Sequence, residues 1–171
     1  MATYTFFNGG VGMQNHLPGE APFRANIDIP KLIAGTGPMK TANTSNVATA
    51  LASTGFAAAD ILQVFEVPAG FLLRIVGARV TTAEGGACTA DIGNASATQT
   101  HLLAAAAVGY MGTFDLNTVG TQITLVTDTH LGGDTYEGVV FITNGTIDVT
   151  FVTAATAVAI FDVWACGWKC F

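Results

Sequence analysis

The segment spanning residues 61–93 constrains the fold most strongly, because it holds two long apolar runs separated by turn-forming residues. The runs Ile61–Val67 and Phe71–Thr82 are rich in Val, Ile, Leu and Phe, which suit a pleated, half-buried surface. Proline and glycine at residues 68–70 break the first run, and the sequence Glu-Gly-Gly at residues 84–86 breaks the second. The segment therefore predicts three strands joined by two short turns.

Further strands are predicted along the rest of the chain. Residues 23–29 alternate apolar and polar side chains, which is typical of a strand with one solvent-exposed face, and Pro30 ends the run. Later strands are expected at residues 122–127, 136–143, 146–153 and 158–168, and one is expected to begin at residues 114–116. Residues 98–107 predict a short helix or a structured loop, and residues 40–56 a long surface loop.

Turn signals recur every ~8–12 residues between these runs, which is typical of an all-β sandwich or jelly roll. We expect a single domain of this class over residues 23–171, because 171 residues are enough for one sizeable core. The glycine- and proline-rich residues 1–22 predict an extended N-terminal arm instead of a core strand.

The arm carries large apolar side chains that need a surface to pack on. Two alternatives remain open, namely that the arm packs back on its own domain or that it lies on a neighbouring subunit or shell. If the second holds, the arm residues expected in the interface are Tyr4, Phe6, Phe7, Val11, Met13 and Leu17.

The dipeptide Asn144-Gly145 is the strongest hairpin signal in the chain, because a type I′ turn needs positive φ at both central residues. A two-residue turn there would pair Phe141 with Asp148 and would place Ile142 on the core face. Phe141 is therefore predicted to point away from the core and to lie in a subunit contact.

The last predicted strand, residues 158–168, has apolar residues on both faces, so we expect it to be central or sandwiched. Asp162 interrupts one of these faces and needs a partner if it is buried. Arg74 interrupts another apolar strand and is the candidate partner.

Charged residues make up only 11% of the chain, whereas globular domains usually carry about 25%. Either the surface consists mostly of Thr, Asn, Ser and Gly, or the chain is a subunit that buries much of its outside. We favour the subunit, because permanent interfaces are large and more apolar than free surface.

Nucleic acid is an unfavourable partner, because the net charge is −6 and the six basic residues are scattered along the chain. A membrane span is not expected either. The most apolar late stretch, residues 154–168, contains Asp162 and is shorter than the ~20 residues that a spanning helix needs. The first residues lack the basic region of a secretory signal.

No motif predicts catalysis, a metal or a cofactor. The chain lacks a Gly-x-Ser-x-Gly nucleophile motif and a strand–glycine loop–helix phosphate cradle. His130 and Asp134 share one loop, for which a polar turn is the favoured interpretation over a metal site. The odd cysteine count, Cys88, Cys166 and Cys170, favours free thiols, because the last two would lie roughly 13 Å apart in a continuous strand.

Several strand and turn motifs resemble structural proteins of tailed-bacteriophage virions. They are VFEVPAGF at residues 64–71, VGARVTTAEGG at 76–86, ADIG at 90–93, DTY at 134–136, TIDVT at 146–150 and VWA at 163–165. The family named by this resemblance is the jelly-roll capsid decoration, or cement, proteins, including those of cyanophages, and the resemblance covers about residues 60–168. It implies a homotrimer on the capsid surface of a virion that clamps neighbouring major capsid proteins, and it supplies no catalytic residues.

Two other functions remain open. The chain could be another virion component, such as a head-fibre base, a tail protein or an adsorption protein. It could also be a carbohydrate-binding jelly-roll module or a small enzyme on that fold, because Trp164 and Trp168 could stack on a sugar. Their position in the apolar last strand favours a core or interface role.

Overall fold

The structure is a computed structural model, and it describes residues 3–6, 23–36, 40–41, 51, 53–94, 108–125, 127–128, 136–141, 143–153 and 157–169. The possible helix at residues 98–107 lies outside this described part. One short helix, α1 (Ile29–Ile33), accompanies thirteen strands in the described part. The strands are β1 (Thr3–Thr5), β2 (Phe23–Asp28), β3 (Lys40–Thr41), β4 (Ile61–Val67), β5 (Phe71–Thr82), β6 (Thr89–Asn94), β7 (Val108–Asp115), β8 (Gly120–Leu125), β9 (Thr127–Asp128), β10 (Tyr136–Glu137), β11 (Val139–Val140), β12 (Gly145–Phe151) and β13 (Ile160–Lys169).

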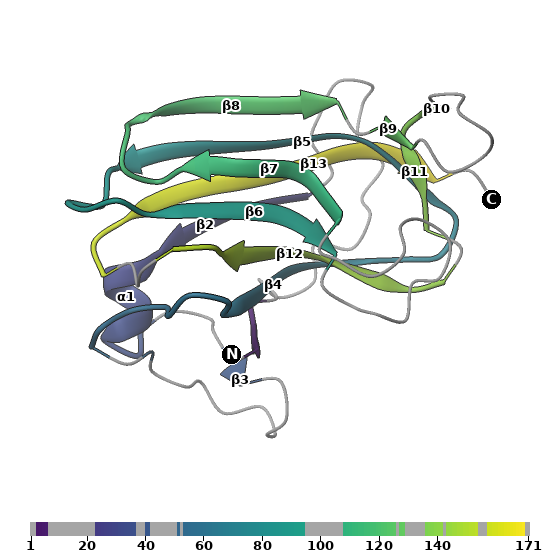
Figure 1. The fold of residues 1–171 in the computed structure, drawn as a ribbon. Coiled ribbons are helices and arrows are strands. Elements are labelled where there is room, and N and C mark those ends of the chain that lie inside the picture. Colours follow the sequence, from purple (N-terminus) through teal and green to yellow (C-terminus); the bar gives the residue numbers. More distant parts are fainter. Residues whose placement is uncertain are drawn as a thin grey trace.

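Two sheets pack face to face and confirm the predicted all-β sandwich (Figure 1). The first sheet has the order β3-β1-β4-β12-β6-β7, and the second has the order β11-β5-β13-β2 with β8 also paired to β5. All pairs within these sheets are antiparallel except the parallel pair of β1 and β4. A separate short pair is formed by β9 and β10.

The two strands predicted around the proline–glycine break are confirmed at the same bounds, as β4 and β5. Gly70 in the connecting turn has a φ of 81°, a conformation that glycine adopts without the steric cost of a Cβ atom. The turn does not make a hairpin, because β4 belongs to the first sheet and β5 to the second. The connection from β5 to β6 crosses back to the first sheet in the same way.

The predicted hairpin at Asn144-Gly145 is wrong. β11 pairs with β5 in the second sheet, whereas β12 pairs with β4 and β6 in the first, so the chain changes sheets here. The Asn144 side chain does not shape a turn between paired strands, since its Oδ1 atom accepts a hydrogen bond of 2.9 Å from the backbone N–H of Ala69. This asparagine instead ties the crossing to the turn between β4 and β5.

Phe141 lies at this crossing, and its expected outward orientation is wrong. Its side chain is fully buried in the core between the sheets. Its backbone N–H donates to the Phe71 carbonyl oxygen at 2.9 Å, and its own carbonyl oxygen accepts from the Gly70 N–H at 2.6 Å. A side chain buried to this extent offers no surface to a neighbouring subunit.

Phenylalanine side chains fill much of the space between the two sheets. Phe56 and Phe151 stack with ring centroids 4.3 Å apart, and Phe23 meets Phe71 edge to face at 5.2 Å. Strand alternation explains this packing, because every second residue of a strand points to the same side. In β2 this gives the observed alternation of buried and exposed residues from Phe23 onward.

The strand predicted at residues 23–29 ends one residue earlier, at Asp28, and the chain continues directly into α1, which contains Pro30. Asp28 caps this helix, since its carboxylate accepts from the Lys31 N–H at 3.1 Å, and Pro30 occupies the first turn, where no backbone donor is needed. Partial burial opposes ionisation of Asp28, yet the hydrogen bonds and the charge of Lys31 hold the pKa of that carboxyl below its usual value.

Candidate functional site

The described part of the N-terminal arm packs on its own domain, which supports the first of the two alternatives for residues 3–6. The expectation of an arm instead of a strand is wrong for residues 3–5, because they form β1 between β3 and β4 of the first sheet. Tyr4 lies in β1, in register with Leu62 of β4. Phe6 is buried in the core, and its N–H donates to the Gln63 carbonyl oxygen at 2.7 Å. The other arm residues expected in an interface, Phe7, Val11, Met13 and Leu17, lie outside the described residues.

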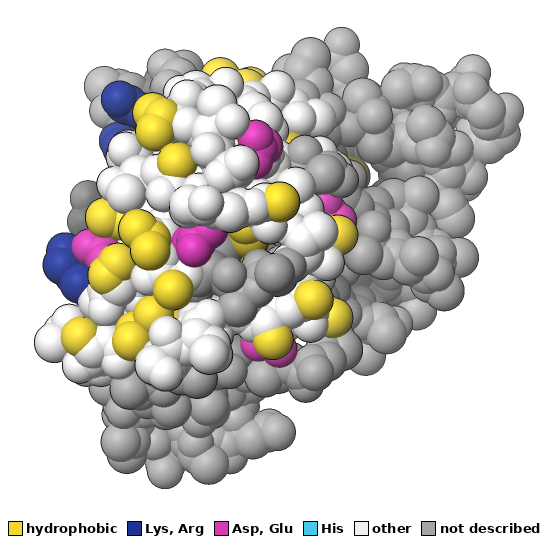
Figure 2. Space-filling view, turned by 60° about the vertical axis from the view of Figure 1, so that its left-hand side comes forward, with side chains coloured by type: hydrophobic (Ala, Val, Ile, Leu, Met, Phe, Trp, Pro, Cys, Tyr) yellow, Lys and Arg dark blue, Asp and Glu magenta, His cyan; other side chains and the backbone are white. Residues whose placement is uncertain are grey.

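The surface is poor in charge, as the composition indicates. Figure 2 shows one side of the molecule, where uncharged polar side chains and backbone prevail and hydrophobic side chains are scattered between few charged ones. The most distinctive group of side chains lies on the outer side of the second sheet.

We call this outer side the tryptophan face. It follows from the alternation of β13, in which Phe161, Val163 and Ala165 are fully buried in the core, so the residues between them point outward. Residues of β2 and β5 that are paired with these positions lie on the same side, and so do the residues of β8 that are paired with the outward residues of β5. The tryptophan face comprises Arg24, Asn26, Leu72, Arg74, Ile75, Gly77, Arg79, Ile123, Asp162, Trp164, Cys166 and Trp168.

Both tryptophans and all three arginines of the chain lie on this face. Several apolar members are open to solvent, with Ile123 63% and Trp168 53% exposed. Aromatic residues and arginine are the types most enriched among residues that dominate binding energy in protein interfaces. The face is therefore the strongest candidate binding surface among the described residues.

Trp164 lies across the backbone of the neighbouring strand. Its partner in the antiparallel register is Gly77 of β5, and a Cβ atom at Gly77 would overlap the indole ring. A glycine inside a strand often marks such a close approach. The ring thus rests on the sheet in the direction of β8, where Ile123 stands opposite Gly77.

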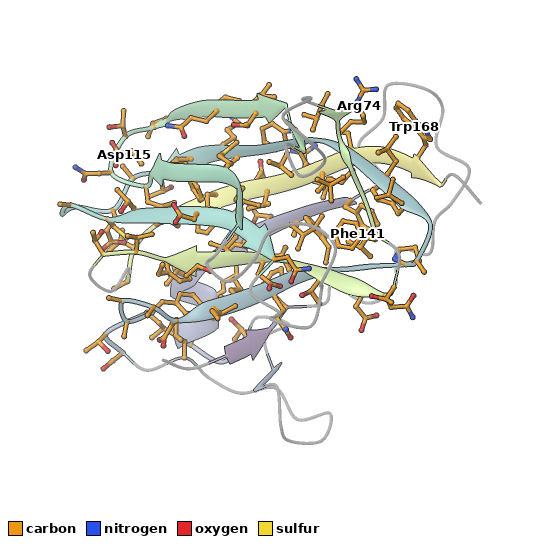
Figure 3. All side chains as sticks on the ribbon, turned by 45° about the vertical axis from the view of Figure 1, so that its right-hand side comes forward. Arg74, Asp115, Phe141 and Trp168 are labelled. Carbon is orange, nitrogen blue, oxygen red and sulfur yellow. The ribbon has the colours of Figure 1, made fainter. Side chains whose placement is uncertain are left out.

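Trp168 is held by Arg74, which was the expected partner of Asp162. The guanidinium carbon of Arg74 lies 5.4 Å from the centre of the Trp168 ring, a cation–π contact, and Figure 3 shows the two side chains together at one end of the second sheet. The same view labels Phe141 in the interior of the sandwich. The predicted pairing of Arg74 with Asp162 is wrong, because Arg74 contacts the ring of Trp168 and Arg24 binds Asp162.

Asp162 is bound by residues of β2, the strand on its other side. Its carboxylate accepts from the Arg24 guanidinium at 3.3 Å and from the Asn26 side-chain amide at 3.0 Å. The aspartate is 9% exposed, whereas the Arg24 side chain is 68% exposed. The register also places Arg79 of β5 opposite Asp162. Asp162 is thus neutralised locally, and the residues named as the tryptophan face keep an excess of positive charge.

A second polar group lies at the far end of the sandwich, around the turn between β7 and β8. The Asp115 carboxylate accepts from the Asn117 N–H and from the Thr118 hydroxyl, both at 2.8 Å. One oxygen of Glu84 accepts from the backbone N–H groups of residues 157–159 at 3.0–3.1 Å. These carboxylates stabilise the turns by accepting hydrogen bonds from turn and loop residues.

A cavity of about 230 Å³ opens beside this turn, lined by Ala78, Val80, Phe114, Asp115, Thr118 and neighbouring residues of β8. Its lining offers one carboxylate, and that group is already bound to the turn. Its other polar lining residues are Thr118, Thr121 and Gln122, and Thr118 is already bound to Asp115 in the turn, so we assign no ligand to this cavity.

The described cysteines are free thiols, as the sequence predicts, and neither is activated. Burial, together with the charges of Glu84 and Asp115, raises the pKa of Cys88 to about 11. Burial also raises the pKa of Cys166. Both groups are therefore protonated at neutral pH and are poor nucleophiles. Cys170 lies outside the described residues.

Within the described ranges, no three His, Cys, Asp or Glu side chains come together as a metal site. The loop that holds His130 and Asp134 is not part of those ranges. The described portion of the chain also contains no helix that is long and apolar enough to cross a membrane.

Sequence reasoning missed the tryptophan face as a surface. Alternation along the predicted strand puts Asp162, Trp164 and Cys166 on one side, but the apolar character of both sides predicts that both are covered. The strand is indeed central, between β5 and β2, with one side in the core and the other open.

No family model, curated protein or solved structure matches the chain.

Proposed function

We propose that the chain is a structural protein of a bacteriophage virion, a decoration or cement protein that binds the outer capsid surface as a homotrimer. The observation that carries this proposal is the tryptophan face, an open side of a sheet with the residue types of a protein interface. In this function the chain catalyses nothing and needs no cofactor.

A protein of this kind acts through binding energy alone. A ligand that binds the mature lattice and not the disrupted one stabilises the lattice by mass action. Several linked copies raise the effective concentration of each contact, so that individually weak contacts add up to tight attachment. The β-sandwich is suited to this role because its sheets present broad, rigid surfaces.

The proposal is tested by sedimenting labelled protein with expanded and with immature capsids of a phage that encodes it. Co-sedimentation with expanded capsids, together with a higher temperature of capsid disruption, is the expected result. Protein that stays in the supernatant with both capsid forms would refute the proposal. Labelling confined to the tail in electron micrographs would instead support the alternative of a tail or adsorption protein.

A carbohydrate-binding module is the second candidate, favoured by the position of Trp164 on Gly77 and the exposure of Trp168 on the same strand. The aliphatic neighbours Leu72, Ile75 and Ile123 weigh against it, because a sugar platform needs hydrogen-bonding groups around the rings. A glycan array separates the two functions, since specific glycan binding lost in Trp168→Ala would favour the module.

A further inference from the structure

The strand β8 lies at the margin of the second sheet and is open to solvent on both of its sides (Figure 1). In the described part of the chain it pairs only with β5. Successive residues of a strand point to opposite sides, so a strand with one covered side alternates between buried and exposed residues, as β2 does. In β8, by contrast, Gly120, Thr121, Gln122 and Ile123 are all exposed, Ile123 by 63%.

The hydrogen-bond pattern of the second sheet shows which backbone groups of β8 face the open edge. Where β2 passes into α1, the Ile29 N–H donates to the Ala159 carbonyl oxygen at 3.2 Å, in the register of β2 and β13. Bonded and non-bonded pairs alternate along an antiparallel ladder, and a strand uses alternate residues for its two neighbours. Followed through the registers of β13 and β5, this alternation makes Ala78 and Gln122 a bonded pair. The residues before and after Gln122 therefore direct their backbone N–H and C=O groups away from β5, toward the open edge.

This edge lacks the features that protect free strand edges in proteins. Charged side chains, proline, bulges or a covering segment usually prevent such an edge from pairing with another chain. The sequence of β8 is GTQITL, without a charged residue or proline, and its register with β5 is unbroken. An edge of this kind binds the backbone of another extended strand.

We propose that β8 pairs in antiparallel fashion with β8 of a second copy of this chain, about a two-fold axis that passes through Gln122. This register sets Thr121 of each copy opposite Ile123 of the other, and the outward N–H and C=O groups of both residues are then paired. A second copy fits because β8 is uncharged and places no like charges opposite each other when it meets itself. The contact joins identical surfaces, so it differs from the contact of the trimer proposed above and does not depend on it.

The neighbouring charges do not oppose this contact. Arg79 of β5 is the charged residue paired with β8, and it stands opposite Thr121. In the joined sheet the two Arg79 residues are three strand spacings apart, roughly 14 Å at ~4.8 Å for each spacing. This separation exceeds the Debye length of ~8 Å at physiological salt, so their repulsion is largely screened. The contact would also make one continuous outer surface of two tryptophan faces, because Ile123 lies at the margin of each.

The test uses the position of Gln122 on the axis, where it faces itself. Gln122→Glu and Gln122→Lys each set two like charges opposite each other and are expected to weaken association about tenfold or more. An equal mixture of the two variants should associate again, because Glu then stands opposite Lys. The Gln122 side chain is exposed, so the fold should survive both changes, which circular dichroism verifies.

Light scattering on a sizing column, over a range of protein concentrations, measures the association. The wild type should reach twice the native mass of either variant, whether that variant is a single chain of 17.6 kDa or the proposed trimer. Ala58→Glu and Ala58→Lys are the matched controls, because they add the same charges at an exposed turn before β4. Neither control should change the native mass.

Amide hydrogen exchange gives a second measurement on the wild type. The amides of Thr121 and Ile123 should be protected at high protein concentration and lose this protection on dilution, whereas the Gln122 amide stays protected by its bond to β5. A wild type with the same native mass as the Gln122 variants would overturn the inference. Loss of association in both variants without rescue in the mixture would overturn the two-fold register, and so would equal losses in the Ala58 controls. Capsid sedimentation tests the proposed function separately, since a protein that doubles in mass and binds no capsid keeps this contact and loses that function.

Discussion

Replacing Gly77 with alanine tests the geometry of the tryptophan face directly. The added Cβ atom would lie 2.6 Å from the Nε1 atom of Trp164 and would overlap the adjacent ring carbons. The indole ring is the group that can move, because Trp164 is only partly buried and packs on the outer side of the sheet. We therefore expect the sandwich to fold with the ring displaced toward solvent.

The magnitude follows from two opposing effects. Overpacking of a well-fitted contact costs about 1–3 kcal/mol. A Gly→Ala change also restricts the unfolded chain, which stabilises the fold by about 0.4–1 kcal/mol. The expected net loss is roughly 1–2 kcal/mol, which for a chain of this size lowers the melting temperature by about 2–8 °C.

Urea unfolding and thermal unfolding measure this loss, and a red shift of tryptophan fluorescence reports the displaced ring. In a Trp164→Ala background the clash disappears, so Gly77→Ala should then be neutral or slightly stabilising. Gly112→Ala is the matched control, because a Cβ atom there meets nothing within 4 Å. If Gly77→Ala is as stable as Gly112→Ala and the fluorescence is unchanged, Trp164 does not lie on Gly77.

Three further predictions concern other parts of the sandwich. Asp162→Asn should cost about 1–2 kcal/mol in urea unfolding, because it removes the charge bound by Arg24 and Asn26; a neutral result would contradict the assigned pairing. Phe141→Ala should cost about 3–5 kcal/mol, as expected for a core phenylalanine, and a loss below about 1 kcal/mol would contradict its burial. The fold raises the pKa of Cys88 to about 11, so the unfolded chain loses the thiol proton at a lower pH than the folded chain. The free energy of unfolding is therefore highest below the usual pKa of the thiol and decreases as the pH rises from about 9 through 11. Urea unfolding across that range should show a loss of up to about 2–3 kcal/mol that is absent in Cys88→Ala.

The strands that the sequence predicts best are those whose signal is local. β4 and β5 begin and end at the predicted residues, because β-branched and aromatic runs between proline and glycine carry their own boundaries. Pairing between strands is not local. Asn144-Gly145 has the composition of a hairpin turn, yet the strands around it belong to different sheets, and Gly138, with a φ of 98°, interrupts the strand before it.

The ion pair of Asp162 was missed for the same reason. Its partner Arg24 is 138 residues away in the chain and becomes a neighbour only because β2 lies next to β13. A buried carboxylate needs a hydrogen-bond donor, but the sequence alone does not say which of the arginines lies beside Asp162. Only the strand order of the second sheet selects among them.

The outer side of β13 shows what a sequence pattern can and cannot state about burial. Apolar residues on both sides of a strand predict cover on both sides, and within the chain the core covers the side of Phe161, Val163 and Ala165. On the other side, Trp168 stays half exposed and is held by Arg74. Exposed apolar surface of this kind is costly in water, and a partner that covers it regains that free energy. The pattern of the last strand and the charge of its open side therefore favour the same conclusion, that the second cover is supplied by another molecule.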